Sequence, residues 1–148
     1  MVIGKTSKFV KEENAMDCVL GYVLSLDMTS THNMKEYPTL LIKGFDTSCP
    51  LGKFIPKSAI KDPNNVNLKL SVNGVEFQNG NTRDLLFKIP KLIAYITEFF
   101  TLEHGDLILT GTPSGRSTVK HGDLIVASME DLDKIEFPVI EIGYENKK

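Results

Sequence analysis

The stretch LKLSVNGVEFQ, residues 68–78, decides the fold class, because it carries a complete β-hairpin signal. Apolar residues alternate with polar ones on both sides of Asn73-Gly74, at Leu70, Val72, Val75 and Phe77. An Asn-Gly pair favours the tight turn whose twist matches two antiparallel strands. The polar run QNGN at residues 78–81 then predicts the end of the second strand. A sheet is therefore expected around this hairpin.

Other candidate strands occur on both sides of the hairpin. Each is a short run of apolar and β-branched residues between turn signals, as expected for a compact β fold. The runs are VLGYVLSLD (19–27), TLLIKGF (39–45), LGKFIP (51–56), DLILTGTP (106–113), DLIVASME (123–130) and FPVIEIGY (137–144).

One helix is predicted after the hairpin. Thr82 is a candidate N-cap, and apolar residues then recur at helical spacing, at Leu85, Leu86, Ile89, Leu92, Ile93, Ile96 and Phe100. Pro90 interrupts this pattern and is expected to restart the helix from its first turn. His104-Gly105 predicts the helix end, and residues 12–18 predict a second, weaker helix. The predicted class is therefore α+β, mainly β, with one main helix.

Length, charge and cysteine usage exclude several classes of protein. The 148 residues fit one domain, 1–148, and a formal net charge of −2 offers no positive field for a nucleic acid backbone. No apolar run reaches the ~20 residues that a membrane span needs. Cys18 and Cys49 form no CxxC pair, so neither zinc nor a disulfide framework is indicated. The related phrases EHGDLI (103–108) and KHGDLI (120–125) are interpreted as structural turns that precede strands.

Three polar positions near predicted strand ends are candidates for a site. Asp27 follows an apolar run and precedes several hydroxyl residues. The run LILTGTPSG, residues 107–115, presents backbone N–H groups and hydroxyls that can bind a carboxylate or phosphate, although a tight turn that needs glycine is its simpler explanation. Lys43 follows the apolar run TLLI and is either a surface charge or an anchor for an anion. The sequence contains no self-contained catalytic motif.

Taken together, these phrases resemble the C-terminal catalytic domain of the fumarylacetoacetate hydrolase family. The resemblance rests on VIGK (2–5), GYVLSLDMT (21–29), LIKGFDTSCPLG (41–52), VNGVEFQNGNTRDLLFKIPKLIAYIT (72–97), LEHGDLILTGTPSG (102–115) and HGDLIVASME (121–130), which occur in family order. The most similar branch resembles acylpyruvases and oxaloacetate decarboxylases or tautomerases, which are often mitochondrial in eukaryotes.

The resemblance implies a rolled, partly barrel-like mixed sheet, a homodimer, and a cytoplasmic or mitochondrial location. It also implies a Mg²⁺ or Mn²⁺ ion and a short 2-oxo or diketo acid substrate. Asp27 would be a metal ligand, and Lys43 would bind substrate and stabilise the enolate as a catalytic cation. Thr110, Gly111 and Thr112 would bind the substrate carboxylate. An oxygen-bound hard cation suits this chemistry, because it can act as a Lewis acid on the oxo group.

Parts of the family pattern have no counterpart among the 148 residues. The family's other two metal ligands are glutamates in an E-x-E just before the strand that ends in VIGK, and its acid–base residues lie in an N-terminal lid. After Asp27, positions that hold Arg and Gln in the family hold Thr31 and Met34. His32 and Glu36 are candidate substitute ligands. A solitary carboxylate is a poor site for Mg²⁺.

Three explanations remain open at this point. The chain is a truncated part of a longer enzyme, or an inactive relative that serves as a binding or oligomerisation module, or a second chain supplies the missing ligands. The altered loop after Asp27 favours impaired activity. A strand that begins at residue 1 also leaves part of its neighbour's edge unpaired, which predicts a dimer or larger species.

Overall fold

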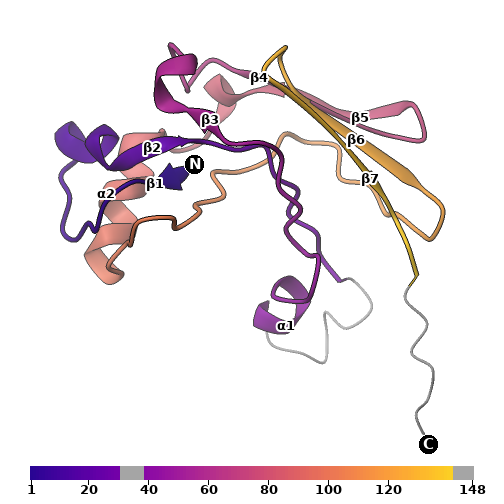
Figure 1. Ribbon diagram of the computed structural model, residues 1–148, viewed down its shortest axis with the longest axis horizontal. Helices are drawn as coiled ribbons and strands as arrows, with labels where there is room; N and C mark the ends of the chain where they lie inside the picture. Colours follow the sequence, from indigo (N-terminus) through magenta and orange to yellow (C-terminus); the bar gives the residue numbers. More distant parts are fainter. Residues whose placement is uncertain (31–38, 142–148) are drawn as a thin grey trace, which may run out of the picture.

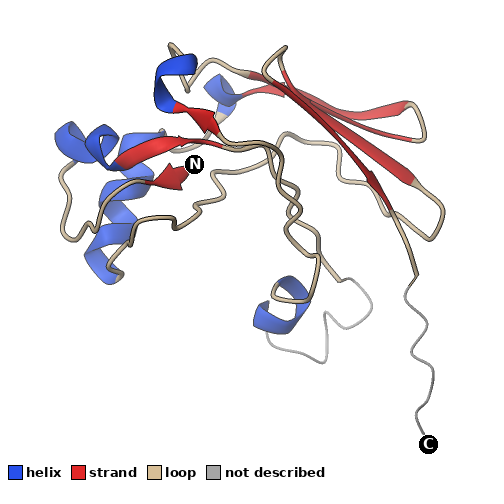
Figure 2. Ribbon diagram, viewed as in Figure 1, coloured by secondary structure: helices blue, strands red, loops and turns tan. Residues whose placement is uncertain are grey.

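The computed structural model describes residues 1–30 and 39–141. Figure 1 shows two sheets, with helix α2 (Ile89–Phe99) beside the first of them. An arm made of residues 26–30 and 39–50 projects away from both sheets and ends in α1 (Thr39–Lys43). Figure 2 distinguishes strands, helices and loops, and shows the two sheets and the short helices joined by long loops. Three short 3₁₀ helices complete it: η1 (Glu12–Cys18), η2 (Lys57–Ala59) and η3 (Thr82–Asp84).

Both sheets are open. The first contains β1 (Val2–Ile3), β2 (Val19–Tyr22) and β3 (Ile55–Pro56), in that order. The second contains β4 (Asn67–Val72), β5 (Val75–Asn81), β6 (Leu124–Met129) and β7 (Asp133–Pro138), in the order β5-β4-β6-β7. All the pairings within these sheets are antiparallel. The predicted class, α+β and mainly β, is confirmed, and the described strands close no barrel.

The predicted hairpin forms as expected. Val72 pairs with Val75 across the turn, and Asn73 and Gly74 have φ values of 51° and 81°. Positive φ at both central residues is what a type I′ turn requires. The Asn73 amide also accepts from the N–H of Leu124 and donates to Asp123 Oδ1, both at 2.9 Å. The hairpin turn is thereby tied to the start of β6.

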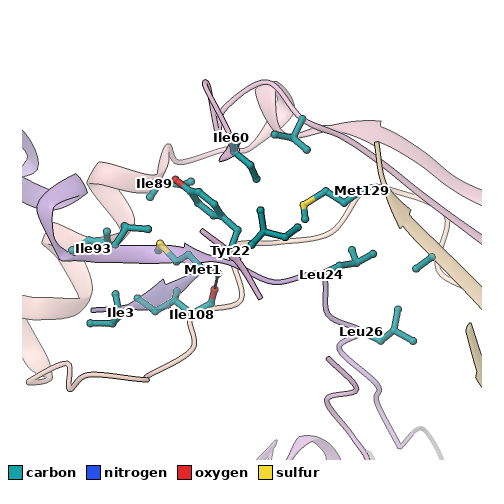
Figure 3. Close-up of a cluster of buried hydrophobic side chains, with 14 of the residues drawn as sticks. Met1, Ile3, Tyr22, Leu24, Leu26, Ile60, Ile89, Ile93, Ile108 and Met129 are labelled. Atoms are coloured by element: carbon teal, nitrogen blue, oxygen red, sulfur yellow. Dashed lines mark hydrogen bonds between the residues drawn. The ribbon is translucent and has the colours of Figure 1, made fainter. Parts of the chain in front are cut away.

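The hydrophobic core joins the two sheets and α2. Figure 3 shows Met1, Ile3, Tyr22 and Ile93 gathered around the first sheet, with Met129 of the second sheet close to them. Ile3 and Ile93 are fully buried. Leu24 and Leu26 are also buried, although they follow β2 rather than belong to it. The core therefore extends along the chain as far as Leu26, the residue before Asp27.

The main helix is shorter than the sequence predicted. Pro90 lies in its first turn, which confirms the predicted restart, but the helix ends at Phe99 rather than at Gly105. It ends there because Leu102 exchanges backbone hydrogen bonds with Ser7, which requires an extended chain. The predicted Thr82 cap is also wrong: Asn81 accepts from the Arg83 N–H and caps η3. None of the helices in residues 1–30 and 39–141 is long and apolar enough to cross a membrane.

Two predicted strands are corrected by the structure. Residues 39–43 form helix α1 rather than a strand, because a short apolar run fits either element, and in this helix Ile42 is buried while Leu40 and Leu41 are exposed. The strand predicted at 137–144 lies earlier, as β7, because the turn after β6 sets the pairing of Met129 with Asp133. Residues 142–144 lie outside the described ranges.

The remaining elements agree with the sequence in type but not in length. The predicted weak helix at 12–18 is the 3₁₀ helix η1. Beyond Tyr22 the run 19–27 continues outside any named strand and is bridged only at Ser25, to Leu51. The run 106–113 forms a single bridge, between Leu107 and Val2. The hydrophobic runs 19–27 and 106–113 therefore predicted extended chain correctly, although regular strand pairing forms over only part of them.

Candidate functional site

Asp27 lies where an extended segment leaves the core. The N–H of Leu26 donates to Pro50 O at 3.1 Å, and the N–H of Met28 donates to Ser48 O at 2.9 Å. Leu24 and Leu26 are buried, whereas Asp27 is exposed. Successive side chains of an extended chain point to opposite sides. This alternation places the carboxylate at the surface, which explains why an acid can directly follow a buried residue.

Lys43 reaches Asp27 from helix α1. Its Nζ donates to Asp27 Oδ1 and to Thr29 Oγ1, each at 2.7 Å. The side chains of Lys43 and Asp27 are 38% and 51% exposed, so the ion pair is partly solvated. The N–H of Ser30 donates to Ile42 O at 3.0 Å, which fixes the end of α1 against the segment that carries Asp27. The structure thus brings two predicted site residues together and adds Thr29.

The described residues do not by themselves fit a divalent cation. Asp27 is paired with an ammonium, and residues 1–30 and 39–141 contain no group of three or more His, Cys, Asp or Glu side chains arranged around a common point. Mg²⁺ is generally held by carboxylates with further oxygen ligands in octahedral geometry. The sequence candidates His32 and Glu36, and the altered positions Thr31 and Met34, lie outside the described part of the chain.

The loop from Thr110 to Gly115 rests on strand β5. Gly115 has φ +100°, and a Cβ placed there would lie 1.7 Å from Phe77 O. A Cβ on Gly80 would lie 2.8 Å from the Pro113 ring. Gln78 Nε2 donates to Thr112 Oγ1 at 2.9 Å and to Pro113 O at 2.6 Å. The glycines therefore permit close packing that holds Thr112 in place, while Thr112 itself is exposed.

Strand β1 relates the two halves of the candidate site. Val2 pairs antiparallel with Gly21 of β2 on one side and with Leu107 on the other. The chain beyond Gly21 and the chain beyond Leu107 therefore run in the same direction. One leads to Asp27 and the other to Thr110, Gly111 and Thr112. No hydrogen bond or ion pair within the described ranges joins Asp27 or Lys43 directly to Thr112.

Sequence reasoning missed the role of Gln78. Gln78, Gly80 and Thr82 are spaced by two residues, and each has a partner in the structure. Gln78 holds the loop, Gly80 accommodates Pro113, and the Thr82 hydroxyl accepts from the Val66 N–H and donates to Pro63 O. Period-two spacing on a strand was the available signal, but the distant partners of these residues could not be read from it.

The two Gly-Asp phrases are structural turns, as predicted. Asp106 Oδ2 accepts from the Glu103 N–H and Asp123 Oδ2 accepts from the Lys120 N–H, each at 2.8 Å. Asp123 is buried and has a second donor in Asn73. These hydrogen bonds, led by the one from Lys120, hold the pKa of Asp123 below its ordinary value. Neither phrase supplies a residue to the candidate site.

Comparison with known proteins places the chain in a family. Residues 1–140 match the family model for the fumarylacetoacetate (FAA) hydrolase C-terminal domain. The chain is 48% identical over 146 residues to a mitochondrial oxaloacetate decarboxylase of Dictyostelium discoideum, covering 95% of this chain and 67% of the relative. It is 44% identical over 149 residues to the mitochondrial oxaloacetate tautomerase FAHD1 of Homo sapiens, covering 97% of this chain and 67% of the relative.

A solved structure extends the comparison to bound groups. Fumarylpyruvate hydrolase from Pseudomonas aeruginosa, in complex with Mn²⁺ and pyruvate, superposes with a TM-score of 0.87 at 31% identity, covering 94% of this chain and 62% of that one. The present chain spans about two thirds of the length of its curated relatives, 67% in the two cases above. The family match covers nearly all of the chain, and the chain accordingly belongs to the fumarylacetoacetate hydrolase family.

Proposed function

We propose that this chain carries the oxo-acid-binding part of a divalent-metal-dependent enzyme that acts on short 2-oxo or diketo acids. The reaction would be that of an oxaloacetate decarboxylase or an oxaloacetate tautomerase, the two activities named for its relatives, or that of an acylpyruvase. The supporting observation is the Lys43 ammonium fixed between Asp27 and Thr29, in a chain of this family. All three reactions pass through an enolate, whose developing negative charge a positioned cation stabilises.

Each candidate residue has a separate role in this proposal. Lys43 faces the oxo oxygen and supplies positive charge as the enolate forms. The Thr112 hydroxyl and the backbone N–H groups at Thr110 and Gly111 bind the substrate carboxylate. Asp27 orients Lys43 and contributes an oxygen ligand to the metal. Mg²⁺ or Mn²⁺ would supply Lewis-acid polarisation when bound.

Activity in the 148 residues alone is proposed to be impaired. The described part of the chain brings one carboxylate to the candidate site, which is too few for tight binding of Mg²⁺. Residues attached ahead of Met1 would continue β1 between the segment that carries Asp27 and the segment that carries Thr110, because β1 pairs with both. Oxygen ligands from such residues, or from a second chain, would complete the site.

The proposal is tested by oxaloacetate turnover with added Mg²⁺ or Mn²⁺. We expect slow turnover that EDTA abolishes. The Asp27→Ala variant should show no turnover. Lys43→Met should lower kcat/KM by about 100-fold or more, as loss of a charge-stabilising donor does in other enzymes. Lys61→Met is the matched control, because it removes an exposed lysine outside the candidate site. A rate that neither EDTA nor Asp27→Ala changes would reject the enzyme.

A second function is favoured by a different observation. Leu40 and Leu41 of α1 are 76% and 54% exposed, and Phe45 is 39% exposed, so the arm carries apolar surface that water covers in a single chain. The alternative is an inactive family member that uses this arm for binding or oligomerisation. Calorimetric titration with Mn²⁺ separates the two functions, because tight binding to the 148-residue chain would remove the main support for inactivity.

A further inference from the structure

Gln78 is placed to control what the Thr112 hydroxyl can do. Its side chain is almost completely buried beneath the loop of residues 110–115, with 8% of the residue exposed. Its amide nitrogen donates to Thr112 Oγ1 at 2.9 Å and to Pro113 O at 2.6 Å. Neither Gln78 nor any other residue of β5 touches Lys43 or Asp27 in the described hydrogen bonds. Its effect on the site must therefore pass through Thr112.

The orientation of the Gln78 amide is forced by chemistry. Pro113 O is a carbonyl oxygen and can only accept a hydrogen bond. The NH₂ group must therefore face Pro113, since a flipped amide would set two acceptor oxygens against each other. The same NH₂ group also lies against Thr112 Oγ1. The Thr112 oxygen consequently acts as an acceptor toward the protein.

Accepting this hydrogen bond leaves the Thr112 hydrogen free to point outward. A hydroxyl has one hydrogen to donate and two lone pairs to accept with. Thr112 is exposed, and within residues 1–30 and 39–141 its hydroxyl is found only as the acceptor from Gln78. We infer that Gln78 is a positioning residue that fixes the Thr112 hydroxyl as a donor, so that the site prefers a carboxylate to a neutral amide. This inference deepens the proposed function and rests on it.

The loop has supports that do not depend on Gln78. Gly115 packs against the Phe77 carbonyl and Gly80 packs against the Pro113 ring. A substitution at Gln78 therefore alters the polarity beneath Thr112 while these contacts still hold the loop. Gln78→Glu is the sharpest variant, because its carboxylate has nearly the same shape but accepts from the Thr112 hydroxyl. The Thr112 lone pairs would then face the ligand.

The experiment compares the binding of pyruvate with that of pyruvamide at one fixed Mn²⁺ concentration, by ligand-observed NMR. The wild-type chain should prefer pyruvate, and Gln78→Glu should lower the pyruvate-to-pyruvamide affinity ratio by about tenfold or more, the value of a charge-assisted hydrogen bond. A general loss of structure would weaken the binding of both ligands alike and leave the pyruvate-to-pyruvamide affinity ratio unchanged. Asn79→Ala, at the exposed neighbour on β5, should keep the wild-type ratio.

A double-mutant cycle protects the test against a misfolded variant. Gln78→Met and Thr112→Val should each weaken pyruvate binding, and the double variant should lose no more than Thr112→Val alone, because Gln78 acts through that hydroxyl. Additive losses, or an unchanged ligand ratio in a folded Gln78→Glu chain that still binds pyruvate, would overturn the inference and leave the proposed function standing. A wild-type chain that binds neither ligand would overturn both, because the proposed function assigns oxo-acid binding to Lys43 and to the loop of residues 110–112, which this chain contains.

Discussion

At the scale of single residues, the tightest constraint in the candidate site is Gly115. Its φ of +100° disfavours any side chain, and a Cβ would lie 1.7 Å from Phe77 O. Gly115→Ala should therefore destabilise the fold by more than about 2 kcal/mol, since it adds a backbone clash to the strain. Gly122→Ala is the matched control, with φ +89° and open space around its Cβ, and should cost about 1 kcal/mol. Urea unfolding measures both, and equal losses would contradict the clash.

Asp123 should make stability depend on acidity. Because its pKa is held below the ordinary value of 3.8, its contribution is complete above that pH and disappears as the pH falls through the folded-state pKa. Asp123→Asn should lower the urea midpoint at pH 7 and flatten its fall in acid. The comparable change Asp106→Asn, in the twin turn with one backbone donor, should have a smaller effect. Identical acid profiles for wild type and Asp123→Asn would contradict this account.

Residue types predicted part of the candidate site. A carboxylate after a buried run marked Asp27, and small residues marked the loop at 110–115. The pairing of Lys43 with Asp27 could not be predicted, because the five residues TLLIK, three of them apolar, suit a helix as well as a strand. The Gln78 contact joins β5 to a loop far along the chain, and no local pattern carries that information.

At the scale of elements, Thr97 anchors the N-terminal segment to α2. It is fully buried, its Oγ1 accepts from the Val10 N–H at 3.0 Å, and its carbonyl accepts from the Phe9 N–H at 3.0 Å. Thr97→Val should destabilise the fold by about 1–3 kcal/mol, because the partly buried Val10 N–H loses its acceptor. Thr97→Ser keeps the hydroxyl and should cost about 1 kcal/mol for the lost methyl. Amide exchange at Val10 should accelerate selectively in the valine variant, and unchanged exchange would contradict the anchor.

The hairpin and the main helix were the most predictable elements. Asn73-Gly74 dictates its own turn, and Pro90 cannot occupy a helix interior, so local chemistry decided both. The end of α2 was not predictable, because the pairing of Leu102 with Ser7 decides it. The strands predicted at 19–27 and 106–113 are also shorter than expected. In the first, regular pairing ends at Tyr22 and only Ser25 forms a further bridge; in the second, Leu107 alone forms a bridge.

At the scale of the whole molecule, the exposed arm predicts self-association. Sedimentation should give a dimer or larger species, and Leu41→Asp should shift it toward monomer, because a charge in an apolar contact is expensive to bury. Leu86→Asp is the control: Leu86 is 94% exposed but lies outside the arm. A monomer at high concentration, or equal effects of both variants, would contradict association through the arm.

The amine of Met1 has a measurable consequence. It donates to Ile108 O at 2.9 Å inside the core, as Figure 3 shows, and burial lowers its pKa from 8.0 to about 6. A chain that begins at Met1 therefore releases this proton on folding between pH 6 and 8, so its stability should rise across that range by up to about 3 kcal/mol. Acetylation of Met1 should abolish the rise, and urea midpoints across this range measure it.

An amide nitrogen in the same place would hold the same carbonyl and carry no titratable proton. The change in stability between pH 6 and 8 should therefore report whether the nitrogen of Met1 is a free amine. A sample in which a peptide bond or an acyl group replaces that amine should therefore unfold without the rise in stability across this interval.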